Sequence, residues 1–150
     1  MAAGVTQRAT RSRERDHRLW ERRIDAVEET YQAYKALASA RRSAVSQRER
    51  PPDETSSWPL REEAKAAGVK LALYGALETS VAFEEAFNAW AKWYMEILGL
   101  DVYEGAQDRW PLVEEKAKKA DAADQKLFEA LHLEASLRPH RRWPWSRGRH

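Results

Sequence analysis

The stretch Glu78 to Leu98, ETSVAFEEAFNAWAKWYMEIL, decides the fold class of this 150-residue chain. Its large apolar side chains recur at alternating spacings of four and three residues, which places them on one face of an α helix. Smaller apolar residues and Trp93 widen that face to roughly half of the helix circumference. A helix with so wide an apolar face needs neighbours on more than one side. We therefore expect an all-α protein built as a helical bundle.

A long amphipathic helix is expected before this stretch, over roughly residues 13 to 48. Its apolar positions also alternate by four and three residues, and they form a narrow seam of the kind found in coiled coils. We expect this seam to contact another part of the chain or another molecule. Pro51 and Pro52 end the helix, because proline lacks the amide that a helix interior requires. Residues 46 to 57 are predicted to form a loop.

A second helix is predicted to begin at the motif Trp-Pro-Leu at 58–60, because proline is favoured in a first turn. After about Ala67, apolar residues alternate between Gly68 and Gly75, so this part is either an extended bridge or a helix loosened at Gly75. We expect residues 59 to 98 to run back along the first helix as one interrupted segment. Its helical length of about 60 Å matches the first helix at about 54 Å.

The same motif at 110–112 predicts the start of the last long helix, with Glu114 and Glu115 in its first turn, and Pro139 ends this helix. Asp124 falls inside the apolar stripe of the helix. Since burying an unpaired carboxylate is costly, this part of the helix is either less deeply buried or faces a partner that contains a basic residue.

Together these segments predict an antiparallel three- to four-helix bundle with a long first helix, an interrupted second helix that breaks near Gly75, and a long last helix. We expect a single domain over residues 12–138. Residues 1–11 lack periodic apolar side chains and are predicted to be mobile. Residues 139–150 form a basic tail rich in Trp and Arg.

The net charge of +2 is unevenly distributed along the chain. Residues 1–23 carry seven Arg and three acids, a net charge of +4, and residues 138–150 carry five Arg and no acid, a net charge of +5. The rest of the chain therefore carries −7, an acidic middle between two basic ends.

The chain has no Cys, which leaves no disulfide and no thiolate ligand for zinc. No run of apolar residues approaches the length of a membrane span. We expect a cytoplasmic protein, although the acid-poor, Arg-containing first thirteen residues also fit an organelle-targeting peptide.

The phrase Leu71-Ala-Leu-Tyr-Gly75-Ala-Leu-Glu78 follows one long helix and precedes another. It resembles a phrase of small, uncharacterised bacterial helical-hairpin proteins, in which a hydrophobic-Tyr-Gly step is followed by Ser, any residue and Glu. The resemblance covers about residues 20 to 98 and implies a helical hairpin without a known activity. Ala76 stands where that pattern has a Ser able to cap the next helix.

Two Glu-x-x-His spacings, Glu14 with His17 and Glu129 with His132, match the ligand pattern of carboxylate-bridged di-iron bundles. Helical geometry argues against a metal site, because Glu129 lies almost opposite the apolar stripe of its helix and Glu14 lies well off the first seam. We find neither a Gly-rich phosphate loop nor a convincing acid–base pair. We therefore predict no catalytic, cofactor-binding or metal-binding residue and a protein that is not an enzyme.

The leading functional hypothesis is a non-enzymatic interaction or assembly module that binds another protein, or itself, through the aromatic seam left over after folding. The candidate interface residues are Trp20, Ile24, Val27, Tyr31, Tyr34, Phe83, Phe87, Trp90, Tyr94 and Ile97.

The alternative hypothesis is binding to nucleic acid or to an anionic membrane surface through the basic termini. Arg offers contacts to phosphate, and Trp can stack on bases or lie at a lipid interface. A solubilising tail whose Trp residues pack back on the bundle is a third interpretation. The candidate contact residues are Arg138, Arg141, Arg142, Trp143, Trp145, Arg147 and Arg149.

Overall fold

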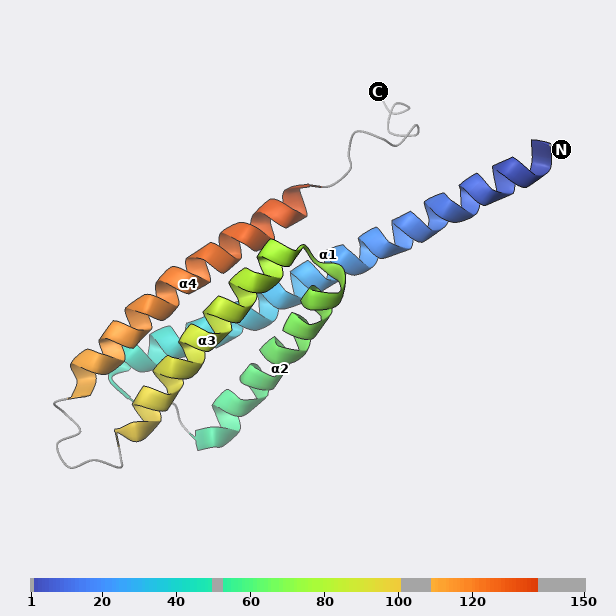
Figure 1. The fold of residues 1–150 in the computed structure, drawn as a ribbon. Coiled ribbons are helices and arrows are strands. Elements are labelled where there is room, and N and C mark those ends of the chain that lie inside the picture. Colours follow the sequence, from blue (N-terminus) through green and yellow to red (C-terminus); the bar gives the residue numbers. More distant parts are fainter. Residues whose placement is uncertain (1, 50–52, 101–108, 138–150) are drawn as a thin grey trace, which may run out of the picture.

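The computed structural model describes residues 2–49, 53–100 and 109–137, which form four α helices (Figure 1). The helices are α1 (Ala2–Gln47), α2 (Asp53–Tyr74), α3 (Leu77–Gly99) and α4 (Trp110–Ser136). The described ranges contain no strand. The prediction of an all-α bundle with a long first helix and a long last helix is confirmed.

Helices α2, α3 and α4 pack side by side with the C-terminal half of α1, and successive helices run antiparallel (Figure 1). Helix α3 packs mainly on α4, and α1 packs mainly on α2, whereas the seam between α2 and α3 is much smaller. All four helices contribute side chains to one apolar core. The bundle therefore has one thinly packed side, between α2 and α3.

Helix α1 extends well beyond the bundle at its N-terminal end (Figure 1). We call residues 2–19 the arm, and every side chain from residue 6 to residue 19 is exposed. The helix was predicted to begin near residue 13, because residues 1–11 have no periodic apolar side chains. A helix nucleated in the bundle can continue into solvent through a segment rich in Ala and Arg, since elongation costs far less than nucleation.

The chain reverses direction between α2 and α3, at Gly75 and Ala76 (Figure 1). The expectation that residues 59 to 98 run back along the first helix as one segment is therefore wrong. Of the two alternatives for the stretch after Gly68, the helix loosened at Gly75 is correct, because α2 continues without interruption to Tyr74.

Two helix starts also differ from the prediction. Helix α2 begins at Asp53, so residues 53–57 are helical and Pro59 lies inside the helix instead of in its first turn. Helix α4 does begin at Trp110 with a proline next to it, but Glu114 and Glu115 lie beyond its first turn.

The aromatic face of α3 forms the centre of the core. Phe83 meets Tyr34 of α1 edge to face, with ring centroids 5.9 Å apart, and stacks on Phe87 at 5.7 Å. Trp90 continues the series and stacks on Tyr94 at 4.8 Å. Such aromatic pairs add to the free energy gained by burying the rings. Most of the aromatic face of residues 78–98 therefore lies inside the bundle.

The turn between α2 and α3 is held by a glutamate from α4. Ala76 is the N-cap of α3 and offers no side-chain cap. Its backbone N–H instead donates to Oε1 of Glu134 at 2.7 Å, and Nε of Arg23 in α1 donates to the same oxygen at 2.7 Å. Glu134 is only 2% exposed. One buried carboxylate therefore joins α1, α4 and the turn.

Gly68 sets how closely α2 approaches α3. A Cβ atom added to Gly68 would lie only 2.2 Å from Cε1 of Phe83. The absent side chain is therefore needed for packing, and this mid-helix glycine does not mark a helix end.

We expect Gly68→Ala to lower the free energy of unfolding by about 1–2 kcal/mol. Alanine would gain up to about 1 kcal/mol in helix propensity, but overpacking a filled core costs about 1–3 kcal/mol. Urea unfolding followed by circular dichroism measures the change. A Phe83→Leu background provides the control, because the smaller side chain leaves room and should remove most of the penalty. If Gly68→Ala stabilises the protein in the native background, the close approach is wrong.

We expect Glu134→Ala to destabilise the protein by about 2–3 kcal/mol, because it removes two charge-assisted hydrogen bonds from a buried site. Glu134→Gln keeps an oxygen acceptor for the Ala76 amide and should cost less. The matched control is Glu129→Ala on the exposed side of α4, which should change little. Hydrogen exchange at the Ala76 amide should accelerate in Glu134→Ala, and unchanged exchange would contradict the capping role.

Candidate interaction surfaces

Most of the predicted interface residues pack inside the bundle. Five of the ten are buried, namely Val27, Tyr34, Phe83, Trp90 and Ile97. Four more are half-buried, namely Trp20, Ile24, Phe87 and Tyr94. Tyr31 alone among the ten is exposed, at 39%. The heptad-like seam of the first helix is therefore covered by the chain's own helices, and little of it is left for a partner.

An open groove remains where α2 and α3 are thinly packed. Its volume is about 720 Å³, and it is lined by Trp58, Pro59, Arg61, Trp90, Ala91, Tyr94, Met95 and Leu98. We call this set the aromatic groove. Trp58 is 51% exposed and Met95 is 70% exposed. The guanidinium of Arg61, which is the single charged side chain of the lining, lies 4.7 Å from the centre of the Trp58 ring.

Of the eight residues that line the groove, only Trp90 and Tyr94 are among the sequence-based candidates, and the exposed large side chains of Trp58 and Met95 are not. Trp58 was predicted only as part of a helix start. Met95 lies off the aromatic stripe of α3, and periodicity alone assigns it to the solvent face. Trp90 and Tyr94 were found because they belong to the stripe. Trp58 and Met95 could have been recognised by their size, since large apolar side chains on the solvent face of a helix often mark interaction surfaces.

A second hollow of about 840 Å³ follows α1 and is bordered by α2 and α4. Its rim carries Glu29 and Lys70, whose side chains pair at 2.7 Å. The hydrogen bond to Glu29 and the charge of Glu29 raise the pKa of Lys70. This hollow is lined by four charged side chains, Glu28, Glu29, Glu63 and Lys70, whereas the aromatic groove is lined by one.

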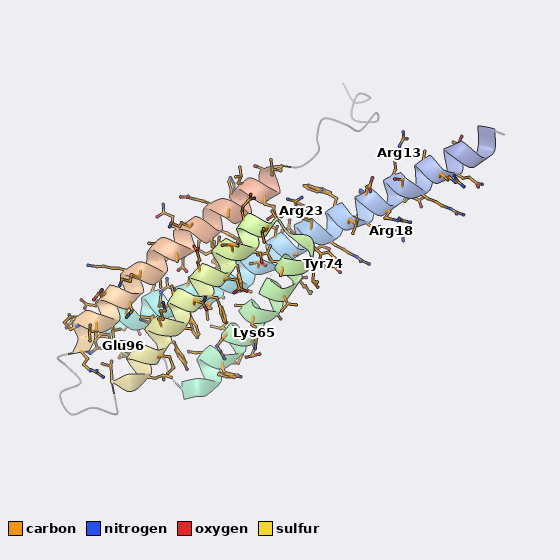
Figure 2. All side chains as sticks on the ribbon, viewed as in Figure 1. Arg13, Arg18, Arg23, Lys65, Tyr74 and Glu96 are labelled. Atoms are coloured by element: carbon orange, nitrogen blue, oxygen red, sulfur yellow. The ribbon has the colours of Figure 1, made fainter. Side chains whose placement is uncertain are left out.

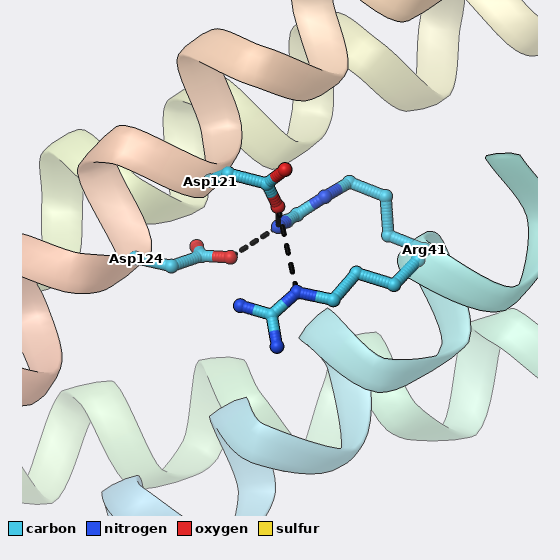
Figure 3. Close-up of polar contacts among 4 residues, drawn as sticks. Arg41, Asp121 and Asp124 are labelled. Atoms are coloured by element: carbon cyan, nitrogen blue, oxygen red, sulfur yellow. Dashed lines mark hydrogen bonds and ion pairs between the residues drawn. The ribbon is translucent and has the colours of Figure 1, made fainter. Parts of the chain in front are cut away.

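A buried ion pair joins α1 to α4 in the core (Figure 3). Arg41 of α1 donates hydrogen bonds to Asp124 and, at 2.7 Å, to Asp121 of α4. The side chains of Arg41 and Asp124 are fully shielded from solvent, whereas that of Asp121 is half exposed. Asp124 was predicted either to be less deeply buried or to face a segment that contains a basic residue. The second alternative is correct, and the segment is α1, which supplies Arg41.

The surroundings of Arg41 and of the neighbouring Tyr34 fix the protonation of these two side chains. Burial alone would lower the pKa of Arg41, but the hydrogen bonds and charges of Asp124 and Asp121 outweigh burial and raise it. Burial and, secondly, the charge of Asp124 raise the pKa of Tyr34 far above its ordinary value. Arg41 therefore stays charged and Tyr34 stays neutral at physiological pH. Buried groups whose protonation stays fixed, such as Arg41 and Tyr34, are suited to holding helices together, not to acid–base chemistry.

The structure does not bring the two Glu-x-x-His spacings together as a metal site. His17 pairs with Glu21 at 3.0 Å on the exposed surface of α1. Within residues 2–49, 53–100 and 109–137, no group of three His, Asp or Glu side chains is placed to hold a metal ion.

The candidate contact residues of the tail, from Arg138 to Arg149, lie outside the described residues. Binding through the tail stays a prediction. Of the helices in the described ranges, none has both the length and the apolar character needed to cross a bilayer.

Comparison with known proteins finds no matching family model, no matching curated protein and no matching solved structure. The resemblance to bacterial helical-hairpin proteins over residues 20 to 98 therefore stays a prediction. Any functional conclusion has to come from the surfaces described above.

We expect Asp124→Ala to destabilise the protein by about 3–5 kcal/mol, because it leaves the buried guanidinium of Arg41 with a single, half-exposed partner. The double variant Arg41→Met/Asp124→Leu should recover most of that loss, since an apolar pair of similar volume removes the desolvation cost of both charges. Urea unfolding of this double variant and of its two single variants, Arg41→Met and Asp124→Leu, gives the coupling energy. Additive losses in the double variant would contradict direct pairing in the core.

Proposed function

We propose that this protein is a non-enzymatic helical interaction module that assembles with a second copy of itself through the aromatic groove. The observation that carries the proposal is the open seam between α2 and α3, where Trp58 and Met95 are exposed beside the half-buried ring of Tyr94 and the buried ring of Trp90. We also propose that the module acts in the cytoplasm, which its cysteine-free composition favours.

The side chains of the groove are of the kind that dominates binding energy in protein interfaces. Trp, Tyr and Arg are enriched at positions where truncation costs most affinity, and Met adapts its shape to a partner surface. The groove supplies these types together, from Trp58 and Arg61 on α2 and from Tyr94 and Met95 on α3. A large exposed Trp beside a hollow also represents apolar surface whose burial would stabilise a complex.

A second copy is the occupant that the groove fits best. In a dimer with two-fold symmetry, the same surface must supply both the protruding and the receiving groups. The aromatic groove meets this condition, because Met95 protrudes from its border while the lining between Trp58 and Tyr94 is hollow. Arg61 does not oppose this packing, since its guanidinium already lies over the Trp58 ring.

We expect the full-length protein to be a dimer at high concentration by size-exclusion chromatography with light scattering. The double variant Trp58→Ala/Met95→Glu should weaken the dimer roughly a hundredfold or more, because it removes an aromatic anchor and introduces a charge into an apolar contact. The matched control is Leu112→Ala/Leu133→Glu, which changes two exposed apolar residues outside the groove in the same way.

Three results decide this proposal. A dimer lost in the groove variant and kept in the control supports it. A native protein that stays monomeric at every concentration overturns it. A groove variant that dimerises as strongly as the native protein also overturns it, because the contact would then lie elsewhere.

A further inference from the structure

The arm carries a continuous stripe of arginines. At about 100° per residue, Arg8, Arg11, Arg15, Arg18 and Arg22 lie within about 80° of one another around the axis of α1. We call these five residues the arginine stripe. They extend over about 21 Å of helix. Arg13 lies opposite the stripe, and Figure 2 shows Arg13 and Arg18 pointing away from the helix on different sides.

The charges of the stripe are available for binding. Arg8, Arg11, Arg15 and Arg18 are exposed, and none of them has an ion-pair or hydrogen-bond partner among the described residues. Arg22, at the base of the arm, lies 5.8 Å from the centre of the Tyr74 ring of α2. The stripe therefore begins where α1 leaves the bundle and continues into solvent.

The acidic residues of the arm border the stripe without interrupting it. By the same helical geometry, Glu14 and Glu21 lie to one side of it and Asp16 lies to the other. Glu21 also pairs with His17. Within the stripe, like charges three and four residues apart repel one another. A polyanion placed along the stripe would relieve this repulsion, so the arm is built to bind negative charge.

The character of the arm selects among polyanions. From residue 6 to residue 19 its single large apolar side chain is Leu19, so the arm lacks the apolar face with which a helix enters a lipid surface. These residues also include no Phe, Tyr or Trp, on which the bases of a single strand would stack. What remains is a row of guanidinium groups, which bind phosphate through two parallel hydrogen bonds.

We infer that the arm binds the phosphate backbone of double-stranded DNA through the arginine stripe, without reading the base sequence. A helix with its side chains is about 10–12 Å wide and fits the major groove of B-DNA, about 12 Å wide, whereas the major groove of duplex RNA is too narrow. Continuous basic helices lie across the major groove in this geometry. The inference does not depend on the aromatic groove, which lies between α2 and α3.

The test measures binding of the full-length protein to a fluorescent DNA duplex of about two helical turns, by anisotropy, between about 50 and 200 mM salt. The stripe variant is Arg8→Gln/Arg11→Gln/Arg15→Gln/Arg18→Gln. The control, Arg13→Gln/Lys65→Gln/Lys118→Gln/Lys126→Gln, removes the same charge from exposed positions outside the stripe. Both variants should keep the melting temperature, because the substituted side chains are exposed.

We expect the stripe variant to bind the duplex at least about tenfold more weakly, with a salt slope smaller by roughly 3–4, since each phosphate contact contributes about 0.9 to that slope. The control should bind like the native protein. Equal weakening in both variants would mean that net charge alone attracts DNA, and this result would overturn the inference. Unchanged binding by the stripe variant, or no binding by the native protein, would also overturn it.

Two further ligands separate DNA from other anions. Single-stranded DNA and phosphatidylcholine vesicles containing phosphatidylserine are titrated under the same conditions. Weaker binding to both than to the duplex supports the inference. Equal or tighter binding to either one overturns it, because a duplex would then not be the preferred ligand of the arm.

Discussion

The reversal of the chain at Gly75 and Ala76 is the constraint on which the rest of the structure depends. It divides the middle of the chain into α2 and α3, each about 33 Å long, where one continuous return would have been about twice that length. Helix α1 is about 69 Å long, so a bundle of this height covers only part of it. The reversal therefore creates both the compact core and the uncovered arm. The reversal is stabilised by a hydrogen bond from the backbone N–H of Ala76 to the carboxylate of Glu134, 58 residues further along the chain.

Helix content and the core face of each helix could be predicted from the sequence, because both follow from the spacing of apolar residues. The direction of α3 could not be predicted in this way. One continuous segment over residues 59 to 98 and two antiparallel helices would bury the same apolar stripes. The local sequence signal for a turn at Ala76 is weak, because alanine cannot cap a helix through its side chain. The cap comes from α4, and no local pattern indicates it. Residues 2–12 of the arm were not predicted to be helical for a related reason, since a helix that buries nothing needs no apolar period.

The buried ion pair between Arg41 and Asp124 could also be predicted only in part from the sequence. The position of Asp124 in an apolar stripe was sufficient to predict either shallow burial or a basic partner, because an unpaired buried carboxylate is too costly. It was not sufficient to choose Arg41 among the many basic residues of the chain, since that choice depends on how α1 and α4 are aligned. For the same reason, the sequence identified the aromatic side chains but did not show which of them line an open groove. Which side chains line a groove depends on which helices pack against each other.

The aromatic groove and the arm differ in chemistry because they arise from different limits on packing. Gly68 lets α2 approach Phe83 of α3 closely near the turn, but toward the other end of the same seam the large side chains of Trp58, Trp90 and Tyr94 leave a hollow between the helices. The groove is thus a defect of core packing and is mostly apolar, whereas the arm lies outside the core and is mostly polar. An apolar surface gains free energy by excluding water, and its contacts depend little on salt. The arginine stripe gains free energy by releasing counterions, and its contacts weaken as salt rises. Salt concentration therefore separates the two surfaces experimentally, even in a protein that uses both.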